Sequence, residues 1–266
     1  MNRVISTLFL TIVIFSSAAH AEAVKDNSFL IEEAYNQDPG VVQFINGYQY
    51  LDPAHEWMYT FTNELPAPNK THQFSYVIPI SKKSGTEDQT NIGDVALNYR
   101  YQLLDDERIA MAPRFSLIAP TGDYKKGFGN GVAGFQFNHA VSVKVSDKWS
   151  NHWNVGFTYT PDAKNEMGEK ASLVGFNFGT SVVYYWTEKT NFLCEFVFNN
   201  NEEVAGDGMK SASSTYYIVP GIRAAYQVGE DLEIVPGIAA MLGVGPSAEE
   251  HERGVYAYLS FESKLW

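Results

Sequence analysis

Cysteine is almost absent from this sequence, because Cys194 is the only one among its 266 residues. A single thiol cannot form an intramolecular disulfide, so no disulfide framework holds this fold together. The same count excludes a structural metal site built on several cysteines. We therefore predict no metal ligands, and no residue pattern in the chain predicts a cofactor.

Basic residues are also scarce. The chain has 19 Lys and Arg against 31 Asp and Glu, which gives a formal net charge of −12. Proteins that bind nucleic acid need basic faces to meet the phosphate backbone. The acidic balance therefore excludes nucleic acid as a partner.

Long apolar runs are missing as well, and the mean hydropathy is −0.22. The run Val4–Phe15 is shorter than the roughly 20 residues that a helix needs to cross a membrane. It follows Arg3 and precedes small residues that end in Ala19-His20-Ala21, which is the pattern of a secretory signal rather than of an anchor. We predict a signal peptide over residues 1–21, cut after Ala21. Arg3 leaves with it, so 18 basic and 31 acidic residues remain, a formal charge of −13.

What the sequence does have is alternation of apolar and polar residues, with 14% aromatics. From residue 41 to the end, alternating segments of about ten residues are separated by turn residues, which is typical of a transmembrane β-barrel. There are about twelve of them, an even number, as bacterial barrels require. Their approximate limits are 41–50, 56–66, 71–81, 92–104, 108–120, 132–145, 149–161, 171–186, 190–200, 214–228, 232–244 and 254–265.

The connections between these segments alternate between short and long. Short turns at one end and long loops at the other are typical of barrels in the outer membrane of Gram-negative bacteria. We therefore predict an all-β fold, a transmembrane antiparallel up-and-down β-barrel of about twelve strands. The short turns are 105–107, 146–148, 187–189 and 229–231, and the longer polar loops are 82–91, 121–131, 162–170, 201–213 and 245–253.

Alternation by itself does not distinguish a membrane barrel from a soluble β-sandwich or lipocalin-like barrel, in which the apolar face points inward. Three features favour lipid outside. The strands are too many for a small closed soluble barrel, and the polar face carries more ionisable groups than a dry core tolerates. Aromatic residues lie near strand ends on the apolar face, where membrane barrels have aromatic girdles: Trp57, Tyr59, Tyr101, Trp149, Tyr159, Tyr184, Trp186 and Tyr226.

A short stretch, residues 22–40, lies between the signal and the barrel over residues 41–266. Residues 28–35 have room for two helical turns, which Asp38-Pro39-Gly40 would stop. We predict a periplasmic segment with a short helix docked at the mouth of the barrel. The alternative is a stretch without order after signal cleavage.

Three stretches carry a resemblance to a known family: EEAYNQDPGVVQ at 32–43, GDVALNYRYQL at 93–103 and APRFSLIAPTGD at 112–123. They resemble the MetA-pathway of phenol degradation family of outer-membrane proteins, and the resemblance covers nearly the whole mature chain. It implies a porin-like barrel with a transport function, loosely linked with the uptake of aromatic compounds. These motifs are strand and loop patterns, so they indicate a family better than a chemistry.

The polar face of the strands should line the lumen. We expect either a selectivity zone, in which charged groups tune which solutes pass, or a set of satisfied ion pairs and amides that plugs a narrow barrel. Counting from the turns, Arg114 should lie opposite Asn98 and Ser142 opposite His152. The lumen candidates are Asp94, Asn98, Arg100, Arg114, Gln136, Asn138, Lys144, His152, Glu195, Arg223, Glu233 and Glu262.

Some outer-membrane barrels are hydrolases, so Ser142 and His152 also suggest a nucleophile and a base. Such a facing pair is more often a hydrogen-bonded polar pair than a catalytic one. We predict no catalytic residue and no enzymatic activity.

The first functional hypothesis is a channel for passive or weakly selective passage of small solutes, aromatic or hydrophobic ones included. The alternative is a closed structural or adhesion-type barrel whose outer loops bind a partner. In either case the expected partners are outer-membrane lipid, lipopolysaccharide and the outer-membrane assembly machinery, and for a channel a small-molecule solute.

Overall fold

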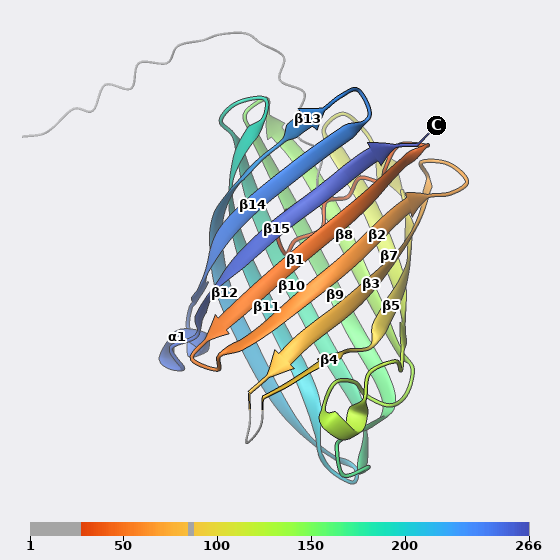
Figure 1. Cartoon of the computed structure of the whole chain (residues 1–266), viewed down its shortest axis with the longest axis vertical. Helices are drawn as coiled ribbons and strands as arrows, with labels where there is room; N and C mark the ends of the chain where they lie inside the picture. The colour runs from red at the N-terminus through yellow and green to blue at the C-terminus, as the bar shows by residue number, and fades with distance from the viewer. Residues whose placement is uncertain (1–27, 85–87, 266) are drawn as a thin grey trace, which may run out of the picture.

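The computed structural model describes residues 28–84 and 88–265, so the predicted signal peptide lies outside the described residues. The chain forms a closed antiparallel β-barrel (Figure 1). Each long strand pairs with the next along the chain, β1 pairs with β15, and β12 pairs with β14. Among the described residues, no helix is long and apolar enough to cross a membrane.

Twelve long strands build the wall, and three short ones, β4, β6 and β13, extend the edges of neighbouring hairpins. The first strands are β1 Val41–Asp52, β2 Glu56–Pro66, β3 His72–Lys83, β4 Gln89–Ile92, β5 Val95–Tyr101, β6 Leu104–Asp105, β7 Ile109–Ala119 and β8 Gly134–Ser146. They are followed by β9 Trp149–Lys164, β10 Lys170–Tyr185, β11 Thr190–Gly206, β12 Met209–Ala224, β13 Tyr226–Val228, β14 Leu232–Gly243 and β15 Arg253–Lys264. Two short helices, η1 Tyr124–Lys126 and α1 Pro246–Glu249, lie in loops.

The barrel has two different ends. The turn end carries the C-terminus, the start of β1 and the short turns, such as the one between β8 and β9. The loop end carries both short helices and the longer connections.

Apolar side chains point out of the barrel. Phe115, Phe137 and Phe157 lie side by side on β7, β8 and β9, with ring centroids 5.0 Å and 6.0 Å apart. Within the part of the chain that the structure describes, no other layer covers them. The alternate residues of the same strands point inward and are polar, for example Ser116 and Asn138, both buried. This polarity requires hydrocarbon outside and confirms the predicted membrane barrel.

The predicted strands are confirmed, most of them within a few residues of their ends, but the loop predicted over 201–213 is wrong. There β11 and β12 continue as a ladder up to a turn at Asp207 and Gly208, and Lys210 bonds Glu202 at 2.8 Å. The sequence is polar because both faces of this hairpin meet water. A polar stretch of this kind has the composition of a loop, so polarity alone led to the wrong prediction.

The two predicted registers have different outcomes. Ser142 does lie opposite His152. Arg114, however, lies opposite Arg100 instead of Asn98. The turn is longer than predicted, since Asp105 pairs with Ala110, and the register then shifts back by one residue between β6 and β5. A longer turn and a register shift both move every pair beyond them, and the residues of the turn do not reveal either in advance.

The helix predicted over residues 28–35 is also wrong. No residue between 28 and 40 is helical, and residues 28–38 lie inside the barrel instead of docking at its mouth. We call residues 28–38 the lumen segment, and its red trace runs across the interior in Figure 1. Its backbone N–H groups bond to side chains of the wall, which leaves them unavailable for helical hydrogen bonds.

A charge placed on the outer face tests the orientation of the strands. Val155 points outward midway between Trp149 and Tyr159, so we expect Val155→Arg to lower the free energy of unfolding by about 2–4 kcal/mol, the usual cost of a charge at mid-membrane. The measurement is urea unfolding in lipid vesicles, followed by tryptophan fluorescence. The control is Thr158→Arg, which places the same charge in the lumen and should cost less. Equal losses would contradict the assigned faces.

Candidate functional site

The lumen segment is attached to the wall through its own backbone. Six of its N–H groups donate hydrogen bonds of 2.8–2.9 Å to side-chain oxygens on strands around the barrel, or close to their ends. In order the pairs are Phe29 and Leu30 to Glu195, Glu32 to Asn154, Ala34 to Ser142, Asn36 to Gln102, and Gln37 to Gln73. The wall side chains thus do for this peptide what a neighbouring strand does in a sheet.

Arg100 on β5 binds the carbonyl side of the same peptide. Its guanidinium donates to the backbone oxygen of Tyr35 at 2.7 Å, to that of Glu33 at 3.3 Å, and to the Asn36 side chain at 2.8 Å. Glu64 lies 3.7 Å from the same guanidinium. One buried cation therefore holds three residues of the segment, and a carboxylate partly balances its charge.

Glu33 is a buried carboxylate that belongs to the segment instead of the wall. It lies 3.3 Å from the Arg223 guanidinium and 3.6 Å from the His152 ring. Removing one partner of a buried ion pair leaves an uncompensated charge, which is strongly destabilising. The charge of Arg223 on β12 is therefore matched to the segment being in place.

The apolar part of the segment meets an apolar part of the wall. Phe29 and Ile31 are buried against the inner faces of β10, β11, β12, β14 and β15. Three wall glycines make room for them, since a Cβ at Gly221 or Gly237 would collide with the Phe29 ring and one at Gly179 with Ile31. The apolar side chains around them are Val183, Tyr185, Leu193, Val197, Tyr217, Val219, Val235, Ala239, Met241, Tyr256 and Tyr258.

A second close approach lies on the opposite side. Ala34 packs against Ala110, Ala112 and Ala140 on β7 and β8, and all four are at most 1% exposed. Small residues here let the peptide backbone approach the wall closely enough for the Ala34 N–H to reach Ser142. Glycine and alanine together shape a channel for a peptide along the inside of the wall.

At the level of the segment the lumen is closed. An open pore would leave the inward side chains in contact with water, but at this level they are at most 3% exposed all around the barrel. These residues are Gln43, Gln73, Arg100, Ser142, His152, Ser181, Glu195, Arg223, Val235 and Ser260. What covers them is the lumen segment, together with the side chains it contacts.

Ion pairs hold the C-terminal end of the segment at the turn end of the barrel. Lys70, in the turn between β2 and β3, lies 3.2 Å from both Asp38 and Asp105. Partial burial lowers the pKa of Lys70, but its hydrogen bonds to Asp105 and Asp38 outweigh this effect and raise the pKa. The lysine therefore stays charged and links the segment to the β6–β7 turn.

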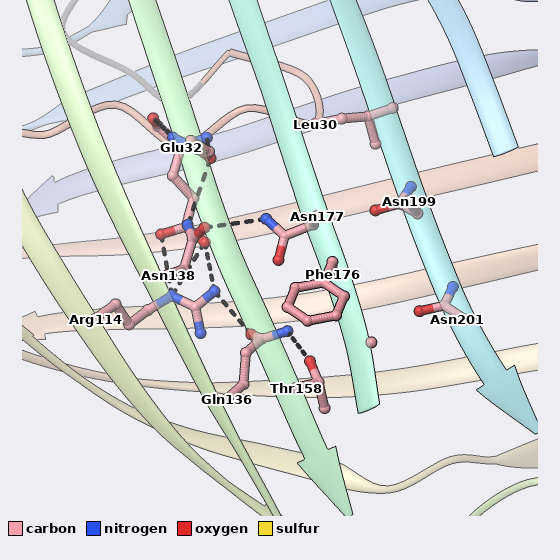
Figure 2. A pocket seen from close by; sticks show the side chains of 12 residues that line it. Leu30, Glu32, Arg114, Gln136, Asn138, Thr158, Phe176, Asn177, Asn199 and Asn201 are labelled. Atoms are coloured by element: carbon pink, nitrogen blue, oxygen red, sulfur yellow. Dashed lines mark hydrogen bonds and ion pairs between the residues drawn. The ribbon is translucent and has the colours of Figure 1, made fainter. Parts of the chain in front are cut away.

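A cavity of about 160 Å³ lies beside the segment on the side of the loop end. Figure 2 shows Glu32 of the segment bonded to Arg114 of β7, which also bonds Gln136 at 3.0 Å. The other lining side chains are mostly amides from β8 to β11. The lining residues are Leu30, Glu32, Arg114, Gln136, Asn138, Asn154, Thr158, Gly175, Phe176, Asn177, Asn199 and Asn201.

Ser142, His152 and Glu33 form an arrangement that resembles a hydrolase triad. The Ser142 hydroxyl lies 2.7 Å from His152 Nδ1, and Glu33 lies on the other side of the ring. The same hydroxyl oxygen accepts the Ala34 N–H, and Ser142 is completely buried. No substrate can reach the hydroxyl in this state, so its role here is to hold the segment.

The structure brings eight of the twelve predicted lumen residues together. All eight contact the segment directly or through one partner, and Asn138 does so beside the Glu32–Arg114 pair. The eight are Asn98, Arg100, Arg114, Gln136, Asn138, His152, Glu195 and Arg223.

The other four predicted lumen residues lie near the ends of the barrel. Asp94 accepts the N–H groups of Gly122 and Asn130, both at 2.9 Å, and so orders the β7–β8 loop. Lys144 is half-exposed and pairs with Asp147 at a turn. Glu233 and Glu262 lie opposite each other at the turn end.

Sequence reasoning missed the lumen segment, which is the shared partner of the eight residues that the structure brings together. It also missed the apolar inner face, although runs such as Val182 to Tyr185 carry a signal. Four consecutive apolar residues in a strand mean that both faces are covered.

Solved structures share this fold. An outer-membrane channel from Pseudomonas putida F1 superposes with a TM-score of 0.66 at 13% identity, over 86% of this chain and 97% of that one. The NanC porin gives a TM-score of 0.52 at 11% identity, over 84% of this chain and all of the porin chain. At such identities the likeness shows the fold alone. No family model and no curated protein sequence matches the chain.

Loss of the Arg100 guanidinium should loosen the segment. Arg100→Ala removes three hydrogen bonds from a charged donor, each worth about 1.5–3 kcal/mol. We expect the amide protons of residues 33–37 to exchange at least about tenfold faster, while the strand amides stay protected. Hydrogen–deuterium exchange followed by mass spectrometry measures this, with Arg108→Ala in an exposed turn as the control. Unchanged exchange in residues 33–37 would show that Arg100 does not hold the segment.

Proposed function

We propose that this protein is an outer-membrane channel for small solutes, and that the lumen segment closes its resting state. The observation that carries the proposal is the closure itself. A peptide from outside the sheet buries the inward side chains, while the wall's own side chains stop short of filling the barrel. A segment attached at one end to β1 and otherwise held by non-covalent contacts is free to leave, and the wall then encloses a passage.

Several features favour a channel over a closed structural barrel. A barrel built only for rigidity would fill its interior with large side chains from its own strands. This wall instead has Gly179, Gly221 and Gly237 where the segment packs. On the loop-end side of the segment, Asn201 lines the cavity and is exposed, so water enters the lumen from the loop end. The lumen is therefore wet on one side of a removable plug.

The predicted signal peptide and the outward apolar face support a location in the outer membrane, with the turn end toward the periplasm. Lipid and lipopolysaccharide would then surround the wall, and the outer-membrane assembly machinery would insert it. The resemblance to the MetA-pathway of phenol degradation family supports a transport role and puts aromatic compounds among the solutes to test. Within the lumen, Arg100, Arg114 and the amides around them are the residues that we propose set solute preference.

Weakening the apolar anchor should open the channel. Phe29→Ala combined with Ile31→Ala removes the two side chains that pack into the glycine-lined part of the wall, and each truncation costs roughly 2–5 kcal/mol of packing. The closed state loses this contact and the open state does not. We expect discrete openings in a planar lipid bilayer to become at least about tenfold more frequent than in the wild type.

The matched control is Phe115→Ala, which removes a similar ring from the outer face and should leave the openings unchanged. Heat-modifiable gel migration shows that each variant is folded. If neither the wild type nor the double variant ever conducts, although both are folded and inserted, the protein is a closed structural barrel and the proposed function fails.

A further inference from the structure

The ion pair between Glu32 and Arg114 differs from the other attachments of the lumen segment. The Glu33 and Arg223 side chains are 6% and 0% exposed, whereas those of Glu32 and Arg114 are 27% and 14% exposed. Both Glu32 and Arg114 line the cavity on the side of the loop end (Figure 2). A solute that enters the lumen from outside the cell therefore meets this ion pair before the buried attachments.

Arg114 is held in place independently of Glu32. Its guanidinium donates to Asn98 at 3.1 Å and to Gln136 at 3.0 Å, and also to the Ser116 hydroxyl. Toward the cavity, the same guanidinium bonds the Glu32 carboxylate at 2.6–3.1 Å through two nitrogens. If Glu32 moves away, an oriented guanidinium remains with its carboxylate-binding edge toward the cavity.

The rest of the cavity offers groups that bind hydroxyls. Asn199 and Asn201 on β11 make no side-chain hydrogen bond with the part of the chain that the structure describes, and Asn177 and Thr158 lie on the neighbouring strands. An amide both donates and accepts hydrogen bonds, which suits a hydroxyl group. The site thus combines one fixed cation with several neutral polar groups.

We propose that this cavity binds a small hydroxylated carboxylate, whose carboxylate takes the place of Glu32 on Arg114, and that this exchange favours release of the lumen segment. The inference rests on the proposed function and names the solute class for it. The cavity, at about 160 Å³, is close in size to an engineered one of about 150 Å³ that holds benzene, and it is open to water at Asn201. A hydroxy acid of roughly three to six carbons is the matching size.

The exchange drives opening through competition. In the closed state Glu32 occupies Arg114, so the solute binds weakly, and in the open state Arg114 is free, so it binds more tightly. A ligand shifts an equilibrium toward the state that it binds better. Any solute that competes with Glu32 therefore favours the open channel.

The probes are gluconate and sorbitol, which share a six-carbon polyol chain and differ in the carboxylate. We expect millimolar gluconate to raise the opening frequency of the wild type at least about fivefold in the bilayer, and sorbitol to leave it unchanged. Arg114→Gln should abolish the response, and Asn199→Ala should weaken gluconate binding about threefold or more while leaving the segment attached. An equal response to both probes would overturn the role of the carboxylate.

Glu32→Gln tests the competition itself. It removes the charge that competes for Arg114, so the Kd of gluconate, measured by calorimetry on the folded mature protein, should fall about tenfold. A merely structural role for Glu32 would leave the Kd unchanged or raise it, and either result contradicts the proposal. If the Phe29→Ala/Ile31→Ala variant conducts but gluconate binds to no variant, this inference fails and the channel stands. If gluconate binds as expected but no variant conducts, the site stands and the proposed function fails.

Discussion

A peptide inside a barrel has no neighbouring strand, and this constraint determines most of what the lumen contains. Each buried N–H or C=O group of the lumen segment needs a partner, since an unpaired one costs free energy comparable to a lost hydrogen bond. Glu195, Asn154 and Ser142 supply acceptors, and Arg100 supplies donors. The polar inner face of the barrel is therefore a set of partners for one particular chain as well as a lining for water.

The inner wall is divided to match the segment. Its mostly apolar sector, from β10 to β15, receives Phe29 and Ile31. Its polar sector, from β3 to β9, receives most of residues 32–37, while Glu33 also pairs with Arg223 on β12. Small wall residues lie where the backbone comes closest, at Gly221 on one side and Ala112 on the other. Stability of the closed state and a route for opening thus come from the same contacts, because the segment is covalently joined to the wall only at β1.

Much of the fold could be predicted from the sequence because a membrane barrel forces a period of two on every strand. The faces, the strand number and the pairing of Ser142 with His152 follow from that period and from the turns. The pairing of Arg100 with Arg114 does not, because the turn after β6 is longer than its sequence indicates and the register shifts again between β6 and β5.

The lumen segment could not be predicted, because residues 28–35 carry no alternation and their partners lie more than 60 residues away in the sequence. For the same reason the lumen candidates were identified without the chain that they bind. The alternation of polar residues correctly predicted that Glu195 and Arg223 face the lumen. Their contacts depend on where the lumen segment lies, and the local sequence pattern does not encode that position.

The central claim is that the barrel wall encloses a passage that residues 28–36 close. The most direct test is the single-channel conductance of the mature protein lacking residues 28–36, recorded beside the intact mature protein, with heat-modifiable migration as the folding control. The account predicts a continuous, salt-dependent current for the shortened chain and rare brief openings for the intact one. The same small conductance from both proteins would contradict it, because the lumen segment would then not be what closes the barrel.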